Sequence, residues 1–378
     1  MNSRLSLGLL ALGLSACADG DTEHTDHADT DTDTDTDTDT DTDLFESVSI
    51  DATDRAVPAY FDLSTGTVLS LTPEQAATST EWHLSVKRFN VRTNGGDSGP
   101  GEVLAGLADA QSDFYTADGA PITDVFVAAT ADGEAEHLTG DVAIPTDLAS
   151  DTLVDTLGDA WYIYDVNTAT VGADDSVGTM IRGGEGDTYA RARVVLIDYP
   201  TRTGDGIKSF EMQFEPWTEA EGFGEAQVWS TSLGPTGGTT CYDMQTDATV
   251  ACEGEAWDIM LYSLGRSFGL QTNGGAAGTG EGAALTPISW SEVSLYTSAL
   301  TNPAGVDLAY ASDDVTNVFD TEGWWAYGLQ GANRLWPNYR VYVIEDGTTQ
   351  YAVQFVGYYG ENGDEPGANI ALRWRELP

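Results

Sequence analysis

The sequence predicts an all-β fold, arranged as two tandem β-rich domains with few short helices. Its candidate strands are about 4 to 8 residues long, rich in Val, Ile, Tyr, Phe and Trp, and separated by Gly, Asp, Asn and Pro. Trp82, Leu84 and Val86 alternate with polar residues, which places them on one face of a strand. Segments 191–199 and 351–359 are apolar enough to be central, buried strands. Helix signals are few, and we expect one short helix within 143–161.

The first 17 residues are a targeting segment. Arg4 precedes the apolar stretch Leu5–Leu14, which is far shorter than the roughly 20 residues of a membrane-spanning helix. The stretch Leu14-Ser15-Ala16-Cys17 resembles the lipobox of bacterial lipoproteins; the alternative is a secretory signal with a chance cysteine. We therefore expect Cys17 to be acylated, which anchors the chain in the outer membrane, at the cell surface.

Residues 18–44 form an acidic tether in which Asp and Thr alternate from Asp29 to Asp43. This segment has no aromatic side chain with which to repay the entropy of ordering, so we expect it to be disordered. Calcium binding is the alternative, because alternate carboxylates lie on one side of an extended chain. The turn glycine and bidentate glutamate of an EF-hand loop are absent, which favours a solvated spacer.

The chain is strongly acidic, with a formal charge of −47 from 62 acidic and 15 basic residues. Such a surface repels nucleic acid, so we expect no nucleic-acid partner. Besides Cys17, only Cys241 and Cys252 are present, and they flank a segment that reads as strand, turn and strand. We expect them to form a disulfide across this hairpin, because a metal pair would need closer spacing and a nearby histidine.

Two parts of the sequence repeat each other. Asp62 matches Asp243, Trp82 matches Trp257, and the Asn-Gly-Gly triplet at 94–96 recurs at 273–275. Further along, the Trp-rich segment at Trp161 parallels that at Trp324, and Tyr189-Ala190 parallels Tyr351-Ala352. We therefore expect one domain at 46–220 and a second at 225–378, joined by a polar connector near 219–222.

The order of these segments resembles the HmuY family of haem-binding surface lipoproteins, once per copy. The first copy carries WHLSVKRFNVRTNGG, WYIY and IRGGEGDTYARARVV; the second carries WWAYG, YRVYVIEDGTTQYAVQFVGYY and IALRWREL. The resemblance implies an all-β fold, an outer-membrane anchor, and haem held between two loops by axial side chains. It also implies an outer-membrane uptake receptor as partner.

The implied haem ligands are two histidines, one in the mid-domain loop and one shortly after the Trp-rich segment. The second position falls near Val166 and Leu329, and neither is histidine. Only His137 lies close to the first position, so it is the one haem-ligand candidate. Methionine can replace histidine on haem iron, but the methionines of both domains read as strand residues: Met180, Met212, Met244 and Met260.

No set of catalytic residues stands out, and we expect the protein not to be an enzyme. Segment 96–100, Gly-Asp-Ser-Gly-Pro, looks like the nucleophile segment of chymotrypsin-like proteases, but no histidine motif accompanies it. His83 lies on the polar face of its strand, where we expect it to be solvated. The aromatic residues of the second copy fit either core packing or stacking on a flat ring.

Two functions therefore remain open. One is haem or tetrapyrrole binding for iron acquisition, with no other metal or cofactor expected. The other is a non-catalytic surface module that contacts protein or glycan without haem.

Overall fold

The structure is a computed structural model that describes residues 44–378, apart from Arg266 and Ala332. It confirms the all-β prediction, since its strands form several antiparallel sheets. The helices of the described residues are single turns or little more, and the bounds are α1 Pro73–Ala76, η1 Ser112–Phe114, α2 Thr123–Ala128, α3 Ala135–Thr139, α4 Trp290–Val293 and α5 Val318–Thr321. None of these helices is long and apolar enough to cross a membrane.

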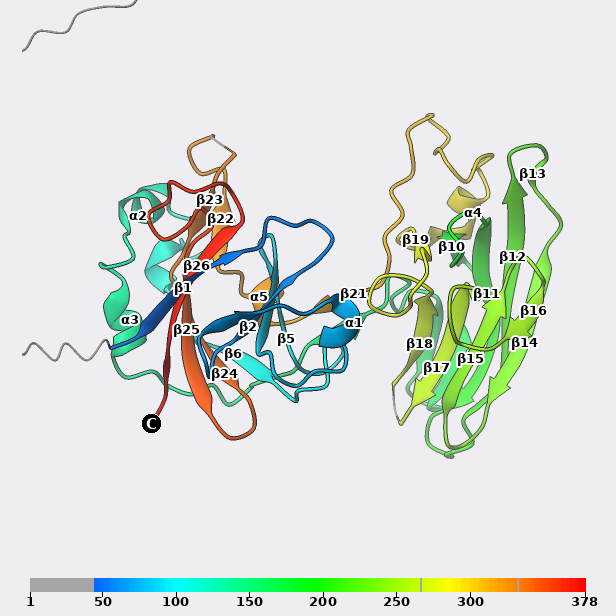
Figure 1. Cartoon of the computed structure of the whole chain (residues 1–378). Coiled ribbons are helices and arrows are strands. Elements are labelled where there is room, and N and C mark those ends of the chain that lie inside the picture. The colour runs from blue at the N-terminus through cyan, green and yellow to red at the C-terminus, as the bar shows by residue number, and fades with distance from the viewer. Residues whose placement is uncertain (1–43, 266, 332) are drawn as a thin grey trace, which may run out of the picture. The chain divides into compact units, whose positions relative to one another are not determined.

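One group of sheets, the terminal lobe, joins both ends of the described chain and comprises residues 44–151 and 314–378. Its main sheet has the order β1-β26-β25-β24-β6, and Figure 1 shows the blue β1 beside the red β26. The bounds are β1 Glu46–Asp51, β6 Leu104–Asp109, β24 Val341–Glu345, β25 Gln350–Gly357 and β26 Asn369–Glu376. A four-stranded hairpin sheet packs on it, with the order β3 Thr67–Leu69, β2 Ala59–Asp62, β4 Leu84–Lys87 and β5 Asn90–Thr93.

The second group, the central lobe, comprises residues 152–313. Its main sheet runs β14-β12-β11-β10-β19, with β9 beside β11 and β8 beside β9. The bounds are β8 Tyr162–Asp165, β9 Thr170–Ala173, β10 Val177–Arg182, β11 Tyr189–Pro200, β12 Ile207–Thr218, β13 Gly222–Phe223, β14 Gln227–Leu233, β19 Ala283–Ala284 and β20 Ile288–Ser289. Its hairpin sheet is β16 Ala248–Val250, β15 Gly238–Asp243, β17 Ile259–Leu264 and β18 Ser267–Thr272.

Strand alternation explains these cores. Along β11, Ala190, Ala192 and Val194 are buried while the residues between them are half-exposed, as expected of a sheet with one face on the core. A bulge between Val194 and Leu196 then shifts the pattern by one residue. The predicted strand at 191–199 is thus confirmed as part of β11, and the predicted strand at 351–359 is confirmed over 351–357 as part of β25.

Each lobe has its own hydrophobic core between its main sheet and its hairpin sheet. In the terminal lobe, Phe61 and Leu84 from early strands pack with Phe355 and Leu372 from late ones, and all four are fully buried. Burying one such side chain contributes about 1.5–3 kcal/mol. The central lobe buries its own set in the same way, including Ile181, Phe210, Phe214, Ile259 and Leu261.

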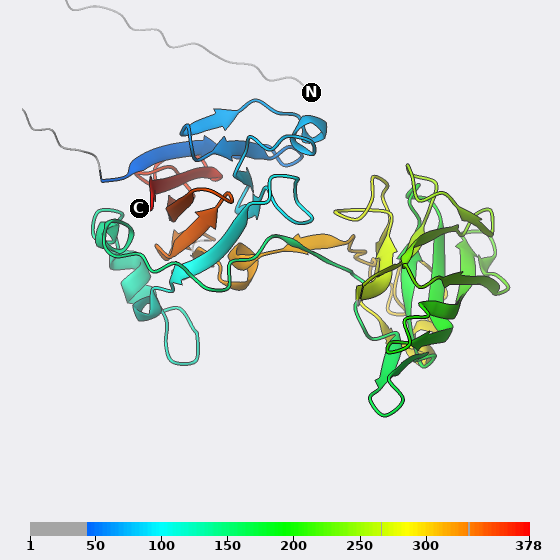
Figure 2. The same ribbon diagram turned by 90° about the horizontal axis from the view of Figure 1, so that it is seen from below.

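The sheets do not follow the two predicted sequence domains. Strands of the first predicted domain, 46–220, pair with strands of the second, 225–378, in both lobes. The predicted connector near 219–222 lies inside the central lobe, where β13 folds back on β12 and Gln227 of β14 pairs with Phe214. Figure 2 shows the blue and red strands together in one lobe and the green and yellow strands in the other.

The short helix expected within 143–161 is wrong. This stretch holds turns and the short strand β7 Thr152–Val154, which pairs with β21 Asp314–Thr316. Long-range bonds keep the segment extended, because Ala149 bridges Ala105 and the Asp151 carboxylate accepts hydrogen bonds from Thr93.

Candidate ligand-binding site

A β-hairpin follows the buried tryptophan of each repeated Trp-rich segment. Trp161 precedes β8, which pairs with β9, and Trp324 precedes β22 Trp325–Tyr327, which pairs with β23 Leu335–Pro337. Both tryptophans are almost fully buried and hold their hairpins on the cores. The position implied for a second haem ligand lies in each hairpin, and a pocket lies beside each of them.

The pocket beside β8 and β9, the central pocket, is walled by aromatic rings. It has a volume of about 660 Å³ and is lined by Tyr162, Tyr164, Val171, Tyr199, Thr201, Arg202 and Phe268. Phe268 organises the wall, since its ring centre lies 4.9 Å from that of Tyr162 and 5.2 Å from that of Tyr199. These tilted and edge-on contacts are the geometry that aromatic pairs prefer, so the wall is pre-formed.

The polar groups of the central pocket are phenols and one cation. Burial raises the pKa of Tyr162, and the nearby Asp159 carboxylate raises it further, so this phenol is protonated at neutral pH. Tyr164 is 43% exposed and reaches solvent at the mouth. Arg202, also exposed, gives the pocket a positive group that can pair with carboxylates of a bound molecule.

The corresponding pocket of the terminal lobe, the terminal pocket, is smaller, at about 250 Å³. The segment 126–131 at the end of α2 closes one side of it, and β23 and the loop 357–363 close the others. The Arg334 guanidinium lies over the Tyr359 ring at 4.6 Å and the Trp336 ring at 5.3 Å, and so occupies the aromatic faces that a flat ligand would use.

The predicted haem-ligand candidate His137 lies in α3, outside both linings. Its Nδ1 is 2.6 Å from an Asp109 oxygen and its Nε2 is 3.5 Å from a Glu134 oxygen. Both ring nitrogens thus face carboxylates. Coordination of iron by His137 would require one of these contacts to break, and its role as a ligand stays a prediction.

The expectation that His83 is solvated is wrong. The residue is 7% exposed, with Nδ1 3.1 Å from Asp62 and Nε2 3.1 Å from Asp346. The turn between β24 and β25 places Asp346 against His83, which directly precedes β4, and so covers the polar face on which His83 lies. The alternation of polar and apolar residues predicted that His83 lies on the polar face, but it did not predict that Asp346 covers this face.

The predictions for the cysteines and methionines have different outcomes. Cys241 and Cys252 form the expected disulfide, with 5.3 Å between their Cα atoms. Met180 and Met212 are buried strand residues, as expected, and Met260 is a half-buried residue of β17. Met244 is buried but lies in the turn after β15, so the prediction that it is a strand residue is wrong. Within residues 44–378, no group of three or more metal-ligating side chains is assembled. Cys17 lies outside the described residues, and so do residues 18–43 of the predicted tether.

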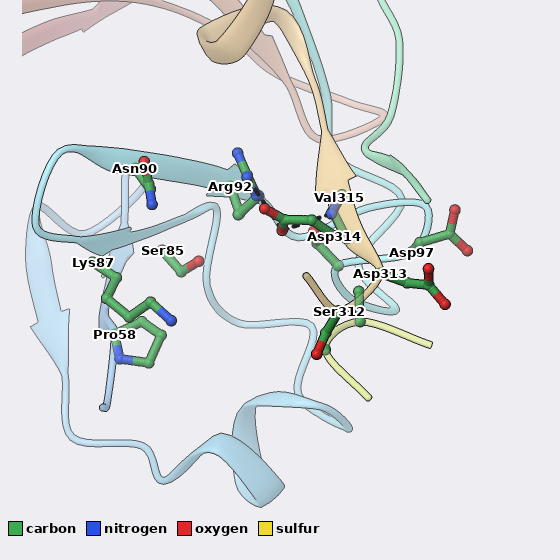
Figure 3. Close-up of a pocket in the computed structure, with 13 residues that line it drawn as sticks. Pro58, Ser85, Lys87, Asn90, Arg92, Asp97, Ser312, Asp313, Asp314 and Val315 are labelled. Carbon is green, nitrogen blue, oxygen red and sulfur yellow. Dashed lines mark hydrogen bonds and ion pairs between the residues drawn. The ribbon is translucent and has the colours of Figure 1, made fainter. Parts of the chain in front are cut away.

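A third cavity, of about 540 Å³, lies beside β21 and is shown in Figure 3. No aromatic ring lines it. Its charged groups are largely paired: Arg92 lies 2.8 Å from Asp320 and 3.7 Å from Asp314. Ser98, of the protease-like segment, donates to the buried Asp151 carboxylate and so has a structural hydrogen bond. This cavity therefore has neither a flat-ring wall nor a catalytic set.

These observations define an antiparallel β-protein with an aromatic pocket beside a hairpin. The family model of the HmuY protein matches residues 55–229, from before β2 into β14. The match confirms the predicted resemblance to this family for one domain. It covers most of the first predicted domain, 46–220, and extends to residue 229. No curated protein matches the chain.

Proposed function

We propose that this protein is a surface lipoprotein that binds haem or a related tetrapyrrole in the central pocket for iron acquisition. The observation that carries the proposal is the pocket itself: aromatic walls, about 660 Å³ of space and an arginine. Small-molecule pockets are typically about 300–1,000 Å³ and mostly apolar with a few placed polar groups. The terminal pocket falls below this range.

The family match supports the haem class of ligand, because residues 55–229 include every lining residue of the central pocket except Phe268. Tyr162 and Phe268 would stack on the macrocycle, and Arg202 would pair with its propionates. The acidic surface repels propionates elsewhere, so this single cation matters more here than it would on a basic protein.

The family's histidine pair has no counterpart in the lining of this pocket. Tyrosine can act as an axial ligand of haem iron, and Tyr164 stands next to the position that the resemblance implies for a histidine. We propose Tyr164 as the iron ligand, in preference to Tyr162, because the raised pKa of Tyr162 opposes formation of the phenolate.

Haemin titration of the purified protein tests this proposal. We expect a Soret shift that Tyr164→Phe reduces and that Arg202→Gln weakens in affinity, whereas His137→Ala leaves it unchanged. Protoporphyrin IX without iron should still quench fluorescence in the Tyr164→Phe protein, because stacking does not need the iron. A Soret shift lost only in His137→Ala would move the site to α3.

Absence of any response to either ring would contradict haem binding and favour the module that contacts protein or glycan, whose aromatic wall would then stack on a sugar. Anchorage through Cys17 is a separate part of the proposal. We expect Cys17→Ser to abolish partition into the detergent phase, and unchanged partition of that variant would contradict the lipid anchor.

A further inference from the structure

The two lobes repeat the same local hydrogen bonds. Thr65 donates to the Asp62 carboxylate at 2.7 Å, and Thr246 donates to the Asp243 carboxylate at 2.6 Å. The amides of Asn94 and Asn273 each donate to the carbonyl of the matching tryptophan, both at 2.8 Å. The repeat seen in the sequence is therefore a repeat of structure, with one member in each lobe.

The main sheets repeat as well. The terminal lobe has the order β1-β26-β25-β24-β6, and the central lobe has β14-β12-β11-β10-β19. Each sequence copy divides into a leading half and a trailing half. The leading halves are 46–151 and 227–313, and the trailing halves are 157–218 and 317–378. In both lobes, the leading half of one copy pairs with the trailing half of the other.

We infer that the chain is a tandem duplication whose copies have exchanged their trailing halves, and that His83 and Asp258 select the exchanged pairing. Each trailing half is thus a partner surface that recognises the leading half of the other copy. Both lobes depend on this exchange for their cores, because each core draws residues from both copies.

Two short crossover segments carry the exchange. They are β7 and β21, which follow the leading halves directly and pair antiparallel with each other. Beyond each crossing, a donor of the following segment bonds the last aspartate of a leading half: the Asn317 side-chain amide donates to Asp151 at 3.0 Å, and the Thr156 backbone N–H donates to Asp313 at 2.6 Å. The leading halves also end alike, because the backbone N–H of Thr93 donates to the Asp151 carboxylate and that of Thr272 donates to the Asp313 carboxylate. The two crossings therefore start from equivalent aspartates, as an exchange requires.

The strand register identifies which residue of each trailing half lies against His83 or Asp258. Ile344 pairs with Ala105 in one lobe, and Ile181 pairs with Ala284 in the other, so Asp346 corresponds to Gly183. Directly beyond the ends of the facing strands, the Leu63 N–H donates to His83 and the Met244 N–H donates to Asp258. His83 therefore corresponds to Asp258.

Each selecting residue fits the trailing half that it meets. His83 meets the Asp346 carboxylate at 3.1 Å. Asp258 instead accepts a hydrogen bond from the Gly184 N–H at 2.7 Å, and a Cβ on Gly183 would lie 2.4 Å from the same Asp258 oxygen. Only a glycine at 183 leaves room for the Asp258 carboxylate.

The unexchanged pairing would break both matches. It would bring Asp346 against the buried Asp258, placing two carboxylates together without room for the second side chain. It would also leave His83 facing the Gly183-Gly184 backbone with no carboxylate from that side. Charge and shape at this one position thus oppose the unexchanged chain.

Double-cysteine variants of the full chain carrying Cys17→Ser test the exchange. Ser49 pairs with Ala371 across β1 and β26, and Ser230 pairs with Glu211 across β14 and β12. We expect S49C/A371C and E211C/S230C each to form a disulfide in oxidised glutathione, located by peptide mapping. The mismatched pairs S49C/E211C and S230C/A371C are the controls, and preferential cross-linking of a mismatched pair would overturn the exchange.

The selection is tested in the mismatched variants after refolding from denaturant. We expect Asp346→Gly to raise the mismatched cross-link roughly tenfold, the change that a charge interaction of one pKa unit produces. Asp346→Asn should raise it in the same direction without removing the side chain. Asp364→Gly, an exposed change in the same trailing half, is the matched control. An unchanged ratio in both Asp346 variants would overturn the role of this position.

Discussion

In the terminal lobe, the loop of residues 110–148 carries α2 and α3, and α2 packs against the pocket behind Trp324. The corresponding loop of the central lobe, 285–312, carries only α4, which packs on β10 while Arg193 stacks on its Trp290 at 4.6 Å. One strand framework therefore holds a pocket of about 250 Å³ in one lobe and about 660 Å³ in the other. The end of α2 borders the terminal pocket, whereas most of the lining of the central pocket comes from strands β8, β9, β11 and β18. The comparison teaches that loop placement and strand extension together decide where a ligand has room.

The largest expected effect separates the two cores. Phe355 is fully buried in the terminal lobe, and Phe355→Ala should cost about 3–5 kcal/mol of unfolding free energy through lost burial and a cavity. In calorimetry, only the unfolding temperature of the terminal lobe should fall. Phe214→Ala is the matched change in the central lobe. A common shift of all transitions would show that the lobes unfold as one unit.

Reduction of the disulfide should lower the unfolding free energy of the central lobe alone. Cys241 and Cys252 are 11 residues apart, so their bridge should contribute about 3 kcal/mol by restricting the unfolded chain. Urea unfolding with and without reductant measures this contribution. The double variant Cys241→Ala/Cys252→Ala should reproduce the effect of reductant and then be insensitive to it. Equal loss in both lobes would contradict the assignment.

Acid should change the unfolding free energies of the two lobes in opposite directions. Burial raises the pKa of Asp258 to about 6, and Asp243 and Glu185 add to the shift, so the central lobe should gain about 1–3 kcal/mol between pH 6 and 4. The pKa of Asp346 is lowered, because hydrogen bonds from Thr349 and His83 outweigh its burial. The terminal lobe should therefore lose stability below about pH 4.

The pH dependence is measured by unfolding at fixed temperature over pH 3–7. Asp258→Asn should remove the gain of the central lobe between pH 6 and 4, while Asp346→Asn should reduce the acid loss of the terminal lobe. A central lobe that weakens steadily from pH 7 to 4 would contradict the raised pKa of Asp258.

The smallest expected difference concerns the two tryptophans. The Trp324 indole N–H donates to the Phe89 carbonyl at 3.1 Å, whereas the buried indole N–H of Trp161 has no hydrogen-bond partner among the residues that the structure describes. Trp324→Phe should therefore cost about 1 kcal/mol more than Trp161→Phe, because it leaves the carbonyl unpaired. Denaturant titration of both variants measures the difference. An equal cost would show that the indole bond contributes nothing net.

Local patterns predicted the fold class, the strand after Trp82, the long strands and the disulfide, because each depends on residues close in sequence. Trp82 itself lies just before β4. Pairing between β1 and β26 joins residues more than 300 positions apart, and no local pattern encodes that choice. The predicted match of Tyr189-Ala190 with Tyr351-Ala352 is off by one residue. Ala190 lies opposite Ile181 and Tyr351 opposite Ile344, since the turn between β10 and β11 is two residues longer than the turn between β24 and β25.

The candidate site was less predictable than the fold. The resemblance pointed to the segment after Trp161, and the central pocket lies there, but Phe268 enters from β18, which lies beyond the residues that the family model matches. The available signal was the run of tyrosines at 162 and 164, followed by Tyr199 and Arg202. Which loops meet around that run depends on tertiary pairing, which alternation and composition do not specify.

The pairing of β1 with β26 also sets an order of assembly during synthesis. The central lobe is one continuous stretch, 152–313, and has all its strands once that stretch has emerged. The first leading half has to wait for the last residues of the chain before β1 gains a neighbour. Until then its strand edges stay open to other chains. A chain built in this way depends on protection of its earliest strands until its final strand arrives.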